Sequence, residues 1–210
     1  MGFRLEDKIK FHISDYIKIK NEIFKLNGRS LYPKRFISSL YFDNKNLDMY
    51  RDSEEGNTPR KKIRFRNYPD AKSKKFFYEV KINSAEGKFK KSSEKTYDQF
   101  KIAFKDGLYD STYGILEKKI QVSYFREYFL VQGTRLTLDY KINYSSPDGF
   151  NKKDDIESLI LEVKSSKNII DIQNKFLNII PIKRERVSKY CEGIDCLFNK
   201  HHLQRLNYAI

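Results

Sequence analysis

A short basic run, residues 60–68, holds the side chains best suited to chemistry. It reads Arg-Lys-Lys-Ile-Arg-Phe-Arg-Asn-Tyr. Because side chains alternate between the two faces of a strand, Arg60, Lys62, Arg64 and Arg66 would share one face. Neighbouring cations there would lie about 6–7 Å apart. At an effective dielectric constant of about 20, each such pair would repel by roughly 2–3 kcal/mol. If this face is enclosed, only a polyanionic ligand would offset the repulsion.

Charged residues occupy one face of most other predicted strands as well. They are Glu6 and Lys8, Glu79 and Lys81, Lys90, Arg126, Arg135 and Asp139, and Glu162 and Lys164. On a single strand, such a face would ordinarily be the solvated outer surface. Its repetition, with Phe, Val, Leu and Tyr on the opposite faces, instead predicts an inside-out sheet. Helices would cover its apolar side, and its charged side would be enclosed.

The composition predicts a folded protein with an anionic partner. The chain has 210 residues, 39% of them hydrophobic, and a formal net charge of +14. This length suits one domain, which we expect to span residues 1–210 and to bury a substantial core. The net charge is compatible with nucleic acid, an anionic membrane or a polyphosphorylated small molecule as the partner.

The cysteines and histidines do not indicate a zinc site or a disulfide framework. Cys191 and Cys196 lie five residues apart in a predicted helix, and the three histidines are scattered. No apolar run is long enough to span a membrane, and no signal peptide opens the chain. We therefore expect a cytoplasmic location.

Hydrophobic periodicity and turn residues predict about eight strands, with a few helices between and after them. The predicted strands cover residues 3–13, 36–42, 60–68, 76–83, 88–92, 120–131, 134–142 and 158–164. Helices are predicted after Ser14, after Asp43, after Thr96, at 168–178 and after Ser188, and residues 145–155 are predicted as a polar loop. Closing an antiparallel sheet into a barrel removes its edges. The predicted fold is therefore α+β, an antiparallel eight-stranded closed barrel with a charged lumen and helices packed outside.

Eight short motifs, in this order, resemble a known family. They are residues 4–8 (Arg-Leu-Glu-Asp-Lys), 39–43 (Ser-Leu-Tyr-Phe-Asp), 60–66, 78–81 (Tyr-Glu-Val-Lys), 124–126 (Tyr-Phe-Arg), 135–139 (Arg-Leu-Thr-Leu-Asp), 161–164 (Leu-Glu-Val-Lys) and 187–190 (Val-Ser-Lys-Tyr). Together they resemble the polyphosphate polymerase (vacuolar transporter chaperone, VTC) domain of the triphosphate tunnel metalloenzyme (CYTH-like) superfamily. Arg4 replaces the first Glu of the superfamily's commoner Glu-x-Glu-x-Lys motif. That departure favours the polymerase branch over the triphosphatase and adenylate cyclase branches.

The resemblance implies a tunnel barrel and a metal-dependent phosphotransferase. Its substrates would be ATP and inorganic polyphosphate, and it would transfer the γ-phosphoryl group of ATP to the growing polyphosphate chain. The implied cofactor is a divalent metal, Mn²⁺ or alternatively Mg²⁺, with Glu162 as its ligand. The implied catalytic cations are Lys8, Arg64, Arg66, Lys81, Arg126, Arg135 and Lys189. The implied substrate-binding residues are Lys90, Tyr124, Arg186, Ser188, Lys164 and Glu6.

The residue types agree with this chemistry. Phosphoryl transfer depends mainly on positioning and on neutralising charge on the phosphate oxygens. Arg side chains give planar bidentate contacts to phosphate, and Glu162 supplies the oxygen that a hard cation prefers. Ser188 and Lys189 open a predicted helix, whose N-terminus favours an anion. Asp139 is placed to orient Arg135, and Glu79 to pair with a cation of the lumen.

Three alternatives remain open. A triphosphate hydrolase of the same fold would use water as the acceptor, and a non-catalytic polyanion-binding module would not need Glu162. Nucleic-acid binding could use Tyr and Phe for base stacking, but these residues lie mainly opposite the cations, so no nucleic acid is expected. Product export would need a membrane-protein partner, because the sequence predicts no transmembrane segment.

Overall fold

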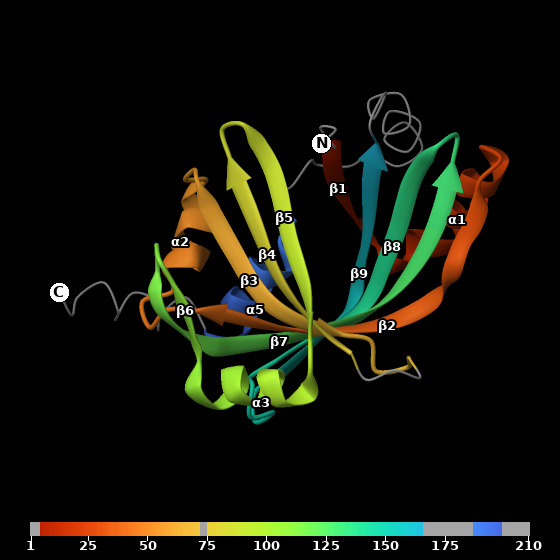
Figure 1. The fold of residues 1–210 in the computed structure, drawn as a ribbon. Helices are drawn as coiled ribbons and strands as arrows, with labels where there is room; N and C mark the ends of the chain where they lie inside the picture. The colour runs from red at the N-terminus through yellow and green to blue at the C-terminus, as the bar shows by residue number, and fades with distance from the viewer. Residues whose placement is uncertain (1–4, 72–74, 166–186, 199–210) are drawn as a thin grey trace. The chain divides into compact units, whose positions relative to one another are not determined.

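The protein combines a mostly antiparallel sheet with a few helices, which confirms the α+β class. The computed structural model describes residues 5–71, 75–165 and 187–198. Its strands are β1 (Leu5–His12), β2 (Arg29–Asp43), β3 (Arg60–Asn67), β4 (Phe76–Ser84), β5 (Gly87–Lys95), β6 (Leu108–Asp110), β7 (Gly114–Val131), β8 (Thr134–Ser145) and β9 (Lys152–Ser165). Its helices are η1 (Ile13–Asp15), α1 (Tyr16–Lys25), α2 (Asp48–Glu55), α3 (Tyr97–Asp106) and α5 (Lys189–Leu197) (Figure 1).

The strands form one nine-stranded sheet instead of the eight strands predicted. Their order is β1-β9-β8-β7-β2-β3-β4-β5, and β6 pairs with β7. The order found among the described residues therefore begins at β1 and ends at β5, which is the order of an open sheet. Closure into a barrel stays a prediction.

Several element boundaries differ from those predicted, and one short strand was not predicted. The strand predicted at 36–42 begins at Arg29, because Pro33 does not prevent extended backbone. The loop predicted at 145–155 is strand from Lys152 onward. The three-residue strand β6 is too short to show a periodic pattern. The helix predicted at 168–178 lies outside the described residues.

The chain divides into two compact units. Unit 1 comprises Met1–Phe36, Tyr124–Ile142 and Asp154–Val187, and unit 2 comprises Ile37–Ser123, Asn143–Lys153 and Ser188–Ile210. Within the described part of the chain, no helix has the length and apolar content needed to cross a bilayer.

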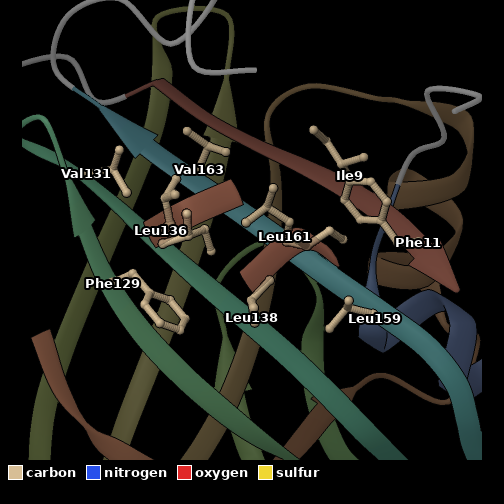
Figure 2. Close-up of a cluster of buried hydrophobic side chains, with 11 residues drawn as sticks. Ile9, Phe11, Phe129, Val131, Leu136, Leu138, Leu159, Leu161 and Val163 are labelled. Atoms are coloured by element: carbon tan, nitrogen blue, oxygen red, sulfur yellow. The ribbon is translucent and has the colours of Figure 1, made fainter. Parts of the chain in front are cut away.

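The core of unit 1 lies between the apolar strand faces and α1. The side chains that form it are Ile9, Phe11, Ile19, Ile23, Phe129, Val131, Leu136, Leu138, Leu159, Leu161 and Val163, all buried. Figure 2 shows its members from β1, β7, β8 and β9 grouped together. α1 contributes Ile19 and Ile23, so a helix covers the apolar face as predicted.

Unit 2 buries its apolar strand faces under α2 and α3. The buried members of this core are Leu40, Phe42, Met49, Ile63, Phe65, Ala103, Tyr113 and Leu116. Phe100 of α3 stacks on Phe76 of β4 at a centroid distance of 4.3 Å. Thr96 starts α3 with a capping box to Gln99, which confirms the predicted helix start. Ile63 and Phe65 of β3 therefore face the helices, and Arg64 and Arg66 face the other way.

Helix α5 is fixed to unit 2 by a buried tyrosine–carboxylate contact. Asp43 is fully buried and accepts hydrogen bonds from the backbone N–H groups of Asn44, Met49 and Tyr50. The Tyr190 hydroxyl of α5 donates to Asp43 Oδ2 at 2.5 Å. Burial, followed by the Asp43 charge, raises the pKa of Tyr190 well above its ordinary value, so the phenol stays a donor. One carboxylate thus orders the start of α2 and anchors α5.

We expect Tyr190→Phe to lower the free energy of unfolding by about 1.5–3 kcal/mol, the usual contribution of a hydrogen bond to a charged group. The ring would remain stacked on Tyr41, so only the hydroxyl contact is lost. Urea unfolding at neutral pH measures the change. Tyr109→Phe is the control, because Tyr109 is 77% exposed. Equal stability of the two variants would show that the Asp43 contact does not anchor α5.

Candidate functional site

The centre of the charged strand face of unit 2 is buried. Arg64 and Arg66 on β3 are each only 6% exposed, and Glu79 on β4 is 3% exposed. Strand register places Tyr41 directly opposite Arg64 on one side and Glu79 opposite it on the other. Ser39 lies opposite Arg66. The alternation read from residues 60–68 is therefore confirmed, and these cations are not a solvated surface.

Three cations converge on the carboxylate of Glu79, and we call this group the Glu79 cluster. Arg64 donates from Nε and Nη2 to Glu79 Oε2, at 2.8 and 2.5 Å. Lys90 donates to Glu79 Oε1, and Arg66 Nη1 lies 3.9 Å from Oε2. Arg64 Nη1 also donates to the Tyr41 hydroxyl at 2.7 Å, and Arg66 Nε to Ser39 Oγ at 3.1 Å. Both guanidinium groups are thus held in fixed orientations.

The electrostatics of the Glu79 cluster favour an anion at its centre. Burial alone would raise the pKa of Glu79, but the charges of Arg64, Arg66 and Lys90 hold it well below its ordinary value. Burial lowers the pKa of Lys90, and the two arginines add to this effect. The Tyr41 hydroxyl is buried, yet Arg64 and Arg66 lower its pKa as well. The positive potential here therefore exceeds what one carboxylate neutralises.

Because the pKa of Glu79 is lowered, we expect the stability of the fold to depend on this residue at acid pH. Its carboxylate form is favoured in the folded state, so it stabilises the fold above the ordinary glutamate pKa of about 4.3 and loses this contribution as the pH falls. Between pH 7 and pH 3, we expect the free energy of unfolding to fall more steeply for the parent than for Glu79→Gln. Urea unfolding across this pH range measures both slopes. Glu94→Gln, at an exposed pair with Lys75, should keep the parent's slope. Parallel slopes for the parent and Glu79→Gln would contradict this account of the cluster.

The N-terminus of α5 adds two predicted site residues to unit 2. Ser188 is the N-cap of α5, where its side chain accepts from the backbone N–H of Cys191, and Lys189 is 8% exposed. Lys62 of β3 donates to Ser188 Oγ at 2.6 Å. Lys81 on β4 lies opposite Lys62 in the strand register.

A second charged group lies in unit 1, and we call it the Glu162 cluster. Arg126 on β7 donates to both oxygens of Asp139, from Nε at 2.5 Å and from Nη2 at 2.6 Å. Its Nη2 also donates to Glu162 Oε2 at 3.2 Å. Lys164 Nζ lies 2.5 Å from Glu162 Oε1 and 3.6 Å from Glu6 Oε2. Lys8, at 3.9 Å from Glu6, lies opposite Glu162 in the strand register.

One predicted pairing in this cluster is wrong. Asp139 was expected to orient Arg135, four residues earlier on the same strand, but it binds Arg126 of the neighbouring strand β7. A cross-strand partner is closer than a residue two pleats away on the same strand, and the planar guanidinium of Arg126 matches the carboxylate bidentately. Arg135 is half-buried on β8, and no hydrogen bond or ion pair joins it to another described residue.

The Glu162 cluster fits a divalent metal that shares its coordination with phosphate. The described residues contain no group of three His, Cys, Asp or Glu side chains placed to hold a metal ion. However, Glu6 and Glu162 lie on either side of the Lys164 ammonium, so a cation between two carboxylates is already accommodated. Mg²⁺-type ions are commonly bound by one or two carboxylates together with substrate phosphates. Glu162 is 3% exposed, and its two oxygens contact Arg126 and Lys164.

The structure places thirteen of the fourteen predicted site residues. Arg64, Arg66, Lys81, Lys90, Ser188 and Lys189 lie in unit 2, whereas Glu6, Lys8, Tyr124, Arg126, Arg135, Glu162 and Lys164 lie in unit 1. Tyr124 is buried, and the Arg126 guanidinium lies over its ring at 5.4 Å. Arg186 lies outside the described residues.

Sequence reasoning missed the residues that hold the predicted ones in place. Tyr41 and Ser39 bind Arg64 and Arg66, but they were not predicted as site residues. The signal was present, because alternation in residues 39–43 places Ser39, Tyr41 and Asp43 on one face. Lys62 shares the face of Arg64 and was also left out of the predicted site.

Comparisons with known proteins agree with this fold. A family model of the VTC domain matches residues 3–198. A proposed adenylate cyclase from Bacillus halodurans superimposes with a TM-score of 0.62 at 15% identity, covering 90% of this chain and 96% of the other. A proposed adenylyl cyclase from Hippeastrum, described as having a dominant triphosphatase activity, gives a TM-score of 0.53 at 16% identity, with 90% and 95% covered. The PH1819 protein of Pyrococcus horikoshii gives 0.56 at 14% identity, with 91% and 99% covered.

A search of curated proteins found no match. At 14–16% identity, the structural likenesses show a shared fold alone. The family match spans nearly the whole chain and includes both charged clusters. The chain therefore belongs to the VTC domain family.

Proposed function

We propose that the protein is an ATP-dependent polyphosphate polymerase, which transfers the γ-phosphoryl group of ATP to a growing inorganic polyphosphate chain. The observation that carries the proposal is the convergence of Arg64, Arg66 and Lys90 on the single carboxylate of Glu79. Arg64 and Arg66 are buried and Lys90 is partly exposed, and three cations around one anionic position are suited to a phosphate group. Family membership adds the polyphosphate context.

Each cluster would contribute a different part of the reaction. In phosphoryl transfer, the protein supplies positioning and charge neutralisation more than covalent chemistry. Arg64 and Arg66 would hold phosphate oxygens with their planar guanidinium groups, and Lys81, Lys90 and Lys189 would act as point charges. Lys8, Arg126 and Arg135 would neutralise charge on the transferring group. Tyr124, Arg186, Ser188, Lys164 and Glu6 would bind or orient the substrates.

A divalent metal, Mn²⁺ in preference to Mg²⁺, would be held through Glu162. When bound, such an ion neutralises charge on the phosphate oxygens. Arg126 and Lys164 both contact Glu162, so they would fix the orientation of its carboxylate. The proposal also includes closure of the sheet into a tunnel and, because ATP is the donor, a cytoplasmic reaction.

A triphosphate hydrolase is the second candidate, because the Hippeastrum protein of the same fold is described as having triphosphatase activity. The two reactions differ in the acceptor, a phosphate chain or water. We would therefore measure ADP and orthophosphate in the same sample of protein, ATP and Mn²⁺. A polymerase releases ADP with far less than one equivalent of orthophosphate. Equal amounts of both would identify a hydrolase, and the absence of both products would leave a polyanion-binding module.

A further inference from the structure

A row of three lysines crosses unit 2, and one of them is not explained by the resemblance. Lys62 on β3 lies directly opposite Lys81 on β4, which lies directly opposite Lys90 on β5. Residues paired in this way share a face of the sheet. Like charges at directly opposed positions destabilise an antiparallel sheet. Lys81 and Lys90 already have proposed phosphate roles, whereas Lys62 has none.

The contacts of Lys62 connect this row to the N-terminus of α5. Its Nζ donates to Ser188 Oγ at 2.6 Å and lies 3.8 Å from the sulfur of Cys191. Ser188 is also the residue whose side chain caps α5. The ammonium of Lys62 is therefore held at a residue proposed to bind phosphate, and an ammonium has three donor hydrogens to share.

The charge of Lys62 acts on the same buried groups as the arginines. Despite burial, Arg64, Arg66 and then Lys62 lower the pKa of Tyr41. Glu79 lies in the neighbouring register position, where it binds Arg64 and Lys90. Arg64, Arg66 and Lys90 thus converge on Glu79 beside the row, and a chain of phosphate groups bound along the row would add negative charge to this positive region.

We propose that Lys62 is a further phosphate-binding residue, which with Lys81, Lys90 and Ser188 forms a subsite for a linear phosphate chain. This inference rests on the proposed function and deepens it. The row spans two inter-strand spacings, about 10 Å between the outer strands. A linear polyphosphate carries charges over such a distance, whereas a single orthophosphate does not. The subsite therefore selects chain phosphates.

The test is direct binding of a linear polyphosphate of fixed length, and separately of orthophosphate, by isothermal titration calorimetry at constant salt. The variants are Lys62→Gln, Lys62→Arg and the control Lys91→Gln. Lys91 is exposed on β5 and lies opposite Val80, on the other face of the sheet. The control therefore removes the same charge away from the row. Thermal unfolding checks each variant, and Lys62→Met, which keeps the aliphatic stem, replaces Lys62→Gln if that variant does not fold.

We expect Lys62→Gln to weaken polyphosphate binding about tenfold, the effect of one lost charge-assisted hydrogen bond. The Kd of Lys62→Arg for polyphosphate should stay close to that of the parent, and Lys91→Gln should change this Kd less than about twofold. Orthophosphate should bind weakly to the parent and to every variant. If Lys62→Gln binds like Lys91→Gln while the parent binds polyphosphate, the role of Lys62 is refuted and the proposed function survives. An equal effect on orthophosphate refutes the chain-binding subsite. If the parent does not bind polyphosphate, both proposals fail.

Discussion

Replacing Arg64 with alanine is expected to lower kcat about a thousandfold, the effect typical of removing an arginine that stabilises a transferring phosphoryl group. Arg64 is buried, donates twice to Glu79 and once to Tyr41, and so is fixed before substrate binds. Arg66→Ala should act similarly, because its guanidinium is held by Ser39. Steady-state release of ADP from ATP and Mn²⁺ measures the loss.

The fold should survive the Arg64→Ala substitution. Glu79 keeps its contact with Lys90, so we expect a cost of about 1–3 kcal/mol in the free energy of unfolding. Arg29→Ala is the matched control, because Arg29 is exposed at the start of β2. If the Arg64→Ala and Arg66→Ala proteins fold and are as active as the Arg29→Ala control, the Glu79 cluster is not part of the active site.

Replacing Glu162 with glutamine is expected to raise the Mn²⁺ concentration for half-maximal activity by about tenfold or more. The amide keeps the shape of the side chain but removes the negative charge that a hard cation requires. The same substitution weakens the orientation of Arg126, which Glu162 shares with Asp139. Activity titrated with Mn²⁺, together with Mn²⁺ binding followed by electron paramagnetic resonance, measures the two effects separately.

Glu157→Gln is the control for Glu162, because Glu157 lies on the same strand and is exposed. It should keep the parent's dependence on Mn²⁺ in both measurements. A Glu162→Gln protein with the parent's Mn²⁺ binding but reduced activity would assign Glu162 to the orientation of Arg126 and not to the metal.

The strand faces could be predicted from the sequence because a strand has a period of two residues. Arg64 and Arg66 point away from Ile63 and Phe65, and the latter two lie in the core with residues of α2 and α3. The same alternation placed Glu162 on the face of its strand that points away from Leu161 and Val163. These two residues are buried in the core of unit 1. The start of α5 at Ser188 was also predictable from local capping chemistry.

Pairing between strands could not be predicted, because it depends on register and on neighbours distant in the sequence. The Arg126–Asp139 pair requires knowledge of how β7 and β8 align. The contact of Tyr190 with Asp43 joins residues 147 positions apart, and no local pattern indicates it. Most of the predicted site residues carry charge, whereas the pairing of Tyr41 with Arg64 and of Ser39 with Arg66 depended on the strand register.

The most direct test of the proposed function is phosphorus NMR of the purified protein with ATP and Mn²⁺. We predict that signals of internal phosphoanhydride groups grow as ATP is converted to ADP, and that Arg64→Ala abolishes this growth. Conversion of ATP to ADP with only an orthophosphate signal would contradict polymerisation and identify the protein as a hydrolase.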